Sequence, residues 1–227
     1  MIERIRKWRV LNLYAGLGGN RRLWTNVDVT AIENNESIAK FYKDHFPNDN
    51  LIITDAHQYL LEHYNEYDFI WSSINCPTHS RARFWSAKPN KKVKPVFPDM
   101  KLYEEILFLK HYFNGKWVVE NVVPFYTPLI EPSVIIGRHC FWSNFHFNHI
   151  DVEEADINRG NKDTWQALHN VDISKYSFTA RRDKVLRNCV NSYLGLHILN
   201  CARNGVKELK EVQKPINKYK NPEIIFE

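Results

Sequence analysis

One cysteine in the sequence stands where an enzyme would place a nucleophile. Cys76 follows the apolar run 67–71 and precedes the polar run 77–81, so we expect it where a buried strand gives way to a loop. A thiol at such a place is either a small buried side chain or a nucleophile, which acts as the thiolate. Residues elsewhere in the chain have to distinguish these two roles.

A glycine loop and two carboxylates predict a ligand that contains adenosine. The loop Tyr14–Gly19 follows the first apolar run, and Glu33 and Asp55 come at the ends of the next two. In doubly wound sheets the glycines let the backbone approach the ligand, and the first carboxylate accepts hydrogen bonds from ribose hydroxyls. The loop has no Walker lysine and no phosphate-binding pattern, so S-adenosylmethionine fits better than a nucleoside triphosphate or a dinucleotide. The predicted cofactor-binding residues of this part of the chain are Tyr14, Gly16, Leu17, Gly18, Gly19, Glu33, Asn34, Asp55 and Ala56.

Helix capping is the alternative role for the polar members of this set. Asn34, Asn35 and Asp55 each come just before an expected helix, where such side chains accept hydrogen bonds from backbone amides. Taken singly, caps are the commoner explanation. The order of glycine loop, ribose acid and adenine acid on successive strands favours the cofactor.

The elements that must position these residues alternate between strand and helix. Strands are expected at 10–14, 27–33, 51–54, 67–73 and 116–120, and helices at 36–46, 56–64 and 100–113, with a further helix opening at 20–24. A later strand is expected at 141–147 and a helix at 185–202, whereas 151–179 shows little periodicity. The alternation predicts an α/β fold with a Rossmann-like, mostly parallel sheet covered by helices on both faces. In such sheets the ligand binds beyond the carboxyl ends of the strands.

The charge distribution and the cysteines limit the kinds of ligand and partner that we expect. The net charge of +5 fits a polyanionic partner, and a basic run with two aromatics, Phe84 and Trp85, lies just after Cys76. The four cysteines are dispersed, without zinc spacing, so we expect neither a metal site nor disulfides. No segment resembles a signal peptide or a membrane span, so a cytoplasmic location is expected. The predicted nucleic-acid contacts are Arg81, Arg83, Lys88, Lys91, Lys92, Lys94, Arg181 and Arg182.

Several segments together resemble the cytosine-C5 DNA methyltransferases, and most closely their compact phage-borne members. Four segments are similar to the family's cofactor loop, nucleophile loop, ENV motif and arginine motif, and a fifth is similar to its closing cofactor motif. In chain order these segments are Leu13–Gly19, Ser72–Ser80, Glu120–Val122, Gly137–Trp142 and Arg187–Val190.

The resemblance implies a role for each matched residue. Cys76 would add to carbon 6 of cytosine, Glu120 would protonate ring nitrogen 3, and Arg138 would bind the exocyclic carbonyl oxygen. Asn121 would hold the neighbouring loop, and Asn188 and Val190 would complete the cofactor site. The target cytosine would be flipped out of double-stranded DNA under a closing loop, 78–97, that includes Ser80. The unperturbed pKa of a thiol is about 8.5, so cations such as Arg81 or Arg138 would have to lower the pKa of Cys76. The unperturbed pKa of Glu is about 4.3, so burial would have to raise the pKa of Glu120.

The sequence also departs from the family's pattern. Asn75 stands where a proline usually precedes the nucleophile, Cys140 replaces a second arginine, and the usual proline near Asn191 is missing. Only about forty residues separate Phe147 from Leu186, so we predict a catalytic core at 1–147, a reduced target-recognition insertion at 148–185, and a helix with a charged tail at 186–227. Either a minimal reader contacts the DNA or a partner protein supplies specificity. The reader would use Arg159, Lys162, Trp165, His169, Arg181 and Arg182.

Two alternatives stay open at this stage. The same thiol chemistry could act on cytosine in RNA, or could transfer a modified group from an altered cofactor. The chain could also be an attenuated relative that binds cofactor and nucleic acid without turnover, because Asn75, Cys140 and the short insertion all depart from the pattern.

Overall fold

A seven-stranded sheet forms the centre of the protein in the computed structural model, which describes residues 6–87, 93–153 and 161–204. The strands are β1 (Trp8–Leu13), β2 (Val27–Ile32), β3 (Asn50–Ile52), β4 (Phe69–Ser72), β5 (Lys116–Val122), β6 (Val134–Ile136) and β7 (His139–Ser143). Their order is β3-β2-β1-β4-β5-β7-β6, with β1 to β5 parallel and β7 antiparallel to both β5 and β6. The predicted fold class, an α/β fold with a Rossmann-like, mostly parallel sheet, is confirmed.

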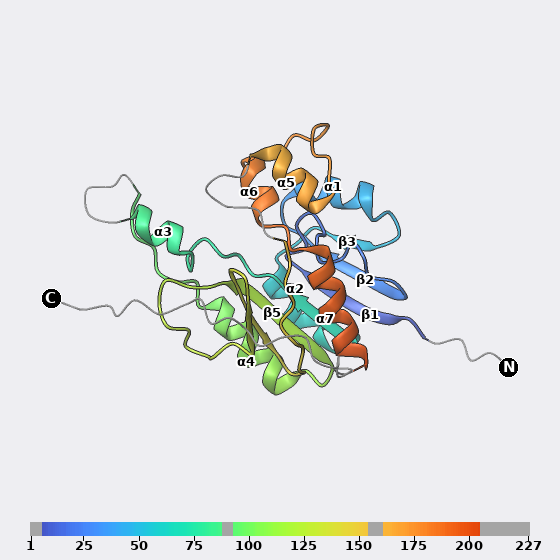
Figure 1. Cartoon of the computed structure of the whole chain (residues 1–227). Coiled ribbons are helices and arrows are strands. Elements are labelled where there is room, and N and C mark those ends of the chain that lie inside the picture. The colour runs from blue at the N-terminus through green and yellow to red at the C-terminus, as the bar shows by residue number, and fades with distance from the viewer. Residues whose placement is uncertain (1–5, 88–92, 154–160, 205–227) are drawn as a thin grey trace.

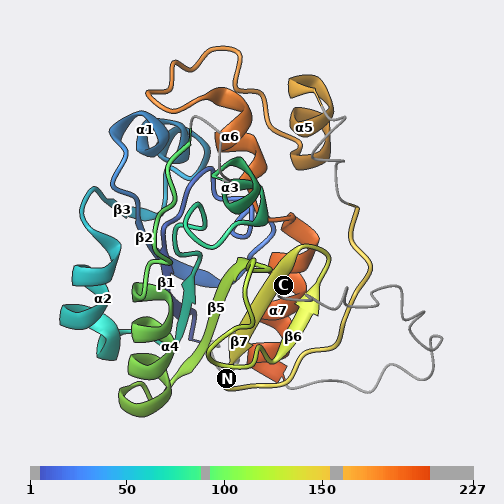
Figure 2. The ribbon, with the colours of Figure 1, turned by 90° about the vertical axis from the view of Figure 1, so that its left-hand side faces the viewer.

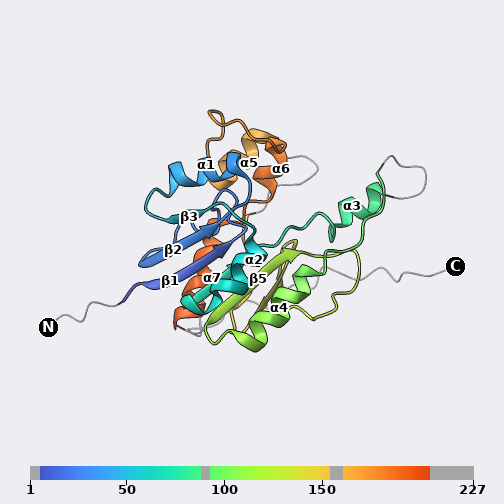
Figure 3. The same ribbon diagram turned by 180° about the vertical axis from the view of Figure 1, so that it is seen from behind.

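Helices cover both faces of this sheet. The helices of the described residues are α1 (Glu36–His45), α2 (Ala56–His63), α3 (Arg81–Ser86), α4 (Lys101–Tyr112), α5 (Lys162–His169), α6 (Arg182–Arg187) and α7 (Ser192–Asn204), with one 3-10 turn, η1 (Tyr64–Glu66). One face of the sheet packs against α1 and α7, and the other packs against α2 and α4 (Figures 1 and 3). Along β4, Phe69 and Trp71 point to the first face and Ile70 to the second, which is why apolar side chains run continuously there.

A third apolar cluster joins the late helices to the front of the chain. Trp165 of α5 and Leu186 of α6 pack with Leu17 of the glycine loop and Phe41 of α1. Figure 2 shows α1, α5 and α6 gathered at the same end of the molecule. The described part of the predicted insertion therefore belongs to the same body as the core.

Two sequence-based expectations are wrong in detail, and two other segments contain helices that the sequence did not predict. Residues 20–24 form turns rather than the start of a helix. The helix expected at 185–202 is two helices, because the Asn191 side chain accepts hydrogen bonds from the amides of Tyr193 and Leu194 and so starts α7 afresh. The closing loop contains a short helix, α3, and the aperiodic segment 151–179 contains α5.

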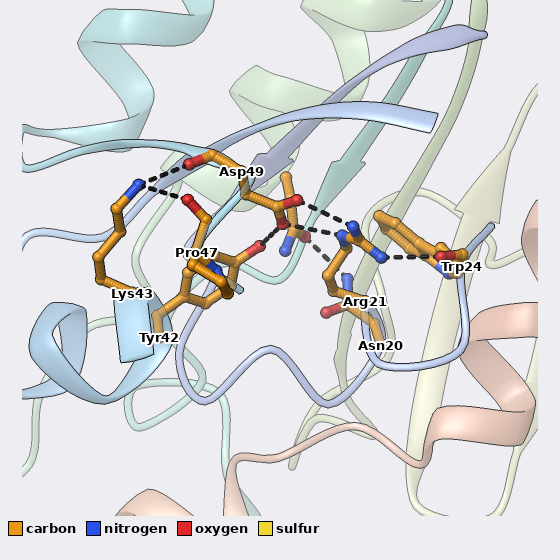
Figure 4. Close-up of polar contacts among 8 residues, drawn as sticks. Asn20, Arg21, Trp24, Tyr42, Lys43, Pro47 and Asp49 are labelled. Carbon is orange, nitrogen blue, oxygen red and sulfur yellow. Dashed lines mark hydrogen bonds and ion pairs between the residues drawn. The ribbon is translucent and has the colours of Figure 1, made fainter. Parts of the chain in front are cut away.

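Polar contacts of Asp49 hold two segments together, the turn after the glycine loop and the loop after α1 (Figure 4). Arg21 donates two hydrogen bonds of 2.8 Å to the Asp49 carboxylate, and the Tyr42 hydroxyl donates a third to the same group. Lys43 donates to the backbone carbonyl of Asp49 at 3.0 Å. The turn after the glycine loop is thereby tied to the loop that follows α1.

We expect this ion pair to contribute strongly to stability. Asp49→Ala leaves the Arg21 guanidinium, whose side chain is 14% exposed, without its partner, so the free energy of unfolding should fall by about 3 kcal/mol. Asp28→Ala is the control, because the Asp28 pair with Lys7 is solvent-exposed and should be worth less than about 1 kcal/mol. Urea unfolding of the two variants checks this; equal losses would contradict it.

Candidate active site

The sheet brings three of the predicted catalytic side chains to one edge. Cys76 follows the carboxyl end of β4, Glu120 lies near the carboxyl end of β5, and Arg138 occupies the turn between β6 and β7. Because β7 runs antiparallel to β5, its first residue, His139, pairs with Val122 at that same edge. The charges of Glu120 and Arg138 both act on the Cys76 thiol, as expected for close neighbours.

Asn121 holds the loop before the cysteine, as the sequence predicts. Its buried side-chain amide donates a hydrogen bond of 3.1 Å to the backbone carbonyl of Ile74. The missing proline at Asn75 is therefore offset by a cross-link from β5, two residues before Cys76.

His79 anchors the other side of the loop that carries Cys76. The sequence did not predict this role, because the partners of His79 lie far away along the chain. The side chain is fully buried, and burial lowers its pKa, so the ring is neutral. Its Nε2 lies 3.1 Å from the Asp99 carbonyl oxygen, which can only accept, so Nε2 carries the proton and donates. Nδ1 therefore has a lone pair and accepts from the Tyr126 hydroxyl at 2.5 Å. Thr78 adds a hydrogen bond from the Asp99 amide. The Cys76 loop is thus fixed to the segments before α4 and after β5.

Burial sets the protonation of the acid in this site. It raises the pKa of Glu120 to about 7, although Ser73 and Arg138 oppose the shift. His139 Nε2 lies 3.5 Å from Glu120 Oε1, but burial and the Arg138 charge lower the pKa of His139 to about 3. We therefore treat this contact as one between a neutral imidazole and a titrating carboxyl, not as an ion pair. Glu120 has the raised pKa that its predicted role requires.

The expectation of a lowered thiol pKa is wrong for the free protein. Burial, and then the Glu120 charge, raise the pKa of Cys76, and Arg138 only partly offsets them. The other expected cation, Arg81, donates to the Pro124 carbonyl at 3.3 Å.

Arg138 connects this edge to the late helices. Its guanidinium donates to the Arg187 carbonyl of α6 at 2.5 Å and lies over the Trp165 ring of α5, 5.8 Å from the centroid. Cys140, at the position of the missing second arginine, is buried in β7 and faces away from solvent.

The carboxylate of Glu33 is preformed at the end of β2. It accepts hydrogen bonds from the Gly16 amide at 3.0 Å and from the Asn35 amide at 2.9 Å, and burial raises its pKa. Gly16 has a φ of 55°, and a side chain there would meet only the Tyr14 carbonyl, at 3.9 Å. Open space beside a glycine turn and a held carboxylate fits a ribose-bearing ligand.

The other glycines of the loop have packing roles. A Cβ on Gly18 would collide with the ring of Phe46, and one on Gly19 would lie 2.3 Å from the Val190 carbonyl. The structure thus brings the glycine loop against Asn188–Val190, which lies in the break between α6 and α7.

Capping accounts for part of the predicted cofactor set. Asp55 is the N-cap of α2, accepting from the Gln58 amide at 2.9 Å, and Ala56 is buried in the first turn. Asn35 is the N-cap of α1, whereas Asn34 is exposed and caps nothing. Asp55 is itself exposed at the end of β3, so capping and ligand binding are compatible there.

The Tyr14 side chain joins a polar network around Glu105 that the sequence did not reveal. Its hydroxyl donates to Glu105 of α4 at 2.6 Å, and the Ser72 hydroxyl donates to the other oxygen of that carboxylate at 2.6 Å. His57 Nδ1 lies 3.1 Å from Glu105, which raises the pKa of His57. Glu105 thus joins the carboxyl ends of β1 and β4 beneath the site.

The predicted nucleic-acid contacts lie on two surfaces. The first, here called the basic arm, comprises residues 81–87 and 93–100 and projects from the body beyond the carboxyl ends of the strands (Figure 1). Ser80 pairs with Pro124 at its base, and Phe84 stacks on Phe125 with centroids 4.5 Å apart. Trp85 and Phe97 are exposed. Arg83 donates to the Lys94 carbonyl at 3.3 Å.

The second surface is at the start of α6. Arg181 pairs with Asp183 at 3.0 Å, and Arg182 donates to the Tyr176 carbonyl at 2.8 Å. Lys88, Lys91, Lys92 and Arg159 lie outside the described residues.

Within the described ranges, no group of three or more His, Cys, Asp or Glu side chains is arranged to hold a metal ion. In the same part of the chain, every helix is too short or too polar to cross a membrane.

Comparison with known proteins yields structural neighbours only. No family model matches the chain, and no curated protein matches it. The chain is similar to DNMT2 from Spodoptera frugiperda, with 20% identity and a TM-score of 0.40 over 64% of this chain and 54% of that one. It is also similar to a TehB-like SAM-dependent methyltransferase from Corynebacterium glutamicum, with 13% identity and a TM-score of 0.33 over 52% of this chain and 56% of that one.

A third neighbour is a SAM-dependent methyltransferase from Archaeoglobus fulgidus, with 18% identity and a TM-score of 0.33 over 51% of this chain and 45% of that one. The match spans about half the length of each of these three proteins. At these identities, what the chain does has to follow from its own side chains.

We expect opposite shifts in the pH profile of Cys76 alkylation when its two charged neighbours are changed. The thiolate reacts, so the rate rises as the pH passes the thiol pKa. Glu120→Gln removes the negative charge that raises this pKa and should move the rise to lower pH, whereas Arg138→Gln should move it to higher pH. Iodoacetamide labelling of Cys76 followed by mass spectrometry measures this, with Cys76→Ser as background. Shifts in the same direction would contradict the proposed electrostatics.

Proposed function

We propose that this protein is a DNA (cytosine-5)-methyltransferase that uses S-adenosylmethionine. One arrangement carries this function: the Cys76 thiol, the titrating Glu120 carboxyl and the Arg138 guanidinium meet at the carboxyl edge of the sheet. Beside them lie the open backbone of Gly16 and the held carboxylate of Glu33.

Carbon 5 of cytosine is a weak nucleophile within an aromatic ring. In the proposed reaction the Cys76 thiolate adds to carbon 6, which turns the ring into an enamine with nucleophilic character at carbon 5. When bound, S-adenosylmethionine supplies an electrophilic methyl group on its sulfonium. Loss of the proton from carbon 5 then expels the Cys76 thiolate and restores the aromatic ring.

Glu120 and Arg138 stabilise the charge that this addition creates. Addition of the thiolate pushes electrons toward ring nitrogen 3 and the exocyclic oxygen. Glu120, with a pKa near 7, holds a proton that it can give to nitrogen 3 and recover later. Arg138 offers guanidinium donors to the carbonyl oxygen, for which it would have to leave the Arg187 carbonyl.

DNA is the substrate that best fits the basic arm. A cytosine inside a duplex cannot reach Cys76, so the base must be flipped out at a cost of a few kcal/mol. The arm is adjacent in sequence to Cys76 and carries Arg81, Arg83 and Lys94 for phosphates, with Trp85 and Phe97 exposed for bases.

A trapping gel tests the function directly. The protein is mixed with S-adenosylmethionine and duplex DNA containing 5-fluorocytosine, in which carbon 5 carries fluorine instead of a removable proton. We expect an adduct that survives denaturant with wild type and with Cys201→Ala, and none with Cys76→Ala. Cys201 is a suitable control because it is buried on α7.

The same gel separates the alternatives. An adduct on RNA but not on DNA would assign the chemistry to RNA cytosine. Binding of cofactor and DNA without any adduct would instead indicate an attenuated relative without turnover.

The arm should contribute to DNA affinity through its aromatic side chains. Trp85→Ala and Phe97→Ala each remove a stacking surface, so we expect roughly fivefold weaker binding or more, measured by fluorescence anisotropy. Tyr193→Ala on α7 is the control, since Tyr193 is 71% exposed and Trp85 is 60% exposed. Equal effects at all three positions would contradict a specific role for the arm.

A further inference from the structure

Arg22 has buried donors without a protein acceptor. Its Nε and Nη2 atoms are inaccessible to solvent and have no hydrogen-bond partner in the described structure. The preceding residue, Arg21, is fully engaged with Asp49 and with the Trp24 carbonyl (Figure 4). A buried cation with unpaired donors is costly, so an anion is expected to complete it.

Arg22 lies where the two predicted cofactor segments meet. Its backbone amide donates to the Gly19 carbonyl at 3.4 Å, and Gly19 in turn packs against Cys189 and Val190. The Arg22 charge reaches the Cys189 thiol, where it opposes the rise in pKa that burial causes. Arg22 therefore lies close to both the glycine loop and the break before α7.

His169 presents an unpaired acceptor to the same region. The side chain is 7% exposed, and its Nε2 has no partner in the described structure. Burial, Arg138 and Arg22 lower the pKa of His169 to about 4, and the ring also hydrogen-bonds to the backbone of Leu186. That bond needs an N–H on Nδ1, so the neutral ring leaves a lone pair on Nε2.

His169 also lines a cavity, together with Arg138, Cys189, Val190 and Asn191. The Arg22 charge acts on the His169 ring, and an unpaired donor cation together with an unpaired acceptor matches a ligand that has both an anionic and a cationic group. A phosphodiester would satisfy Arg22 but has no proton to donate to His169.

We propose that Arg22 and His169 bind an amino-acid headgroup: the α-carboxylate and α-ammonium of the cofactor's methionine moiety. This inference rests on S-adenosylmethionine as the cofactor and adds the residues that select its amino-acid end. The ligand would lie across the glycine loop, with its ribose at Glu33 and its headgroup at Arg22.

Calorimetry with two ligands tests the assignment. S-Adenosylhomocysteine carries the headgroup, and 5′-methylthioadenosine lacks it. Arg22→Gln should weaken binding of S-adenosylhomocysteine roughly tenfold or more, because a charge-assisted hydrogen bond is lost, and should leave 5′-methylthioadenosine within about twofold. His169→Leu should act in the same direction, and Arg22→Lys should retain part of the affinity. Arg9→Gln, at the amino end of β1, is the control and should change neither ligand.

Stability of the ligand-free protein provides a second measurement. Arg22→Gln removes an unpaired buried charge, so its melting temperature without ligand should be equal to or higher than that of wild type. A lower melting temperature together with equal loss of both ligands would make Arg22 a purely structural residue and overturn the assignment.

Two further outcomes are distinguishable. Weaker oligonucleotide binding with unchanged S-adenosylhomocysteine binding would assign the site to a phosphate and overturn the headgroup. If wild type binds neither adenosine ligand, the proposed cofactor fails, and this inference fails with it.

Discussion

The antiparallel pairing of β7 with β5 is the constraint on which the candidate site depends. A parallel β7 would begin at the opposite edge of the sheet, whereas the observed pairing sets His139 beside Val122 and brings the Arg138 turn to Glu120. Gly137, with a φ of 56°, allows the tight turn between β6 and β7. Cys140, Phe141 and Trp142 are buried on alternating faces of β7, so a shift of one residue in register would expose one apolar set to the wrong face.

Local sequence alone predicts the strands and helices in which buried residues follow a simple repeating pattern. The apolar runs of β1, β4 and β5 are readable because both faces of a central parallel strand are covered. The helix expected at 185–202 failed for a physical reason: Leu186, Val190, Leu194 and Ile198 keep helical spacing and are all buried, although Val190 lies outside any helix. Burial of these side chains comes from tertiary packing, and the Asn191 cap that interrupts the helix is a single local contact.

Motif spacing predicted Cys76, Glu120 and Arg138, but it did not indicate the contacts that hold the segments around them. His79 depends on Tyr126, which lies 47 residues further along the chain, and Tyr14 depends on Glu105, 91 residues further. The direction of the Cys76 pKa shift also depended on distant strands. Glu120 and Arg138 lie 44 and 62 residues further along the chain, yet their charges act on the thiol. Electrostatics of this kind follow from the sheet topology and could not be read from proximity along the chain.

Burial drives Cys76, Glu120 and His139 toward their neutral forms, which bears on the proposed reaction. Cys76 keeps its proton, His139 stays neutral, and Glu120 is poised near neutrality, with Arg138 as their positive neighbour. A raised thiol pKa is compatible with catalysis, because addition to cytosine removes a proton from sulfur and places one on ring nitrogen 3. The number of protons in the site is then unchanged. Glu120 has a pKa between those of the thiol and of the free base, so it can carry a proton from the sulfur to the ring nitrogen. A base bound against Arg138 would complete this exchange without any net charge having to enter the buried site.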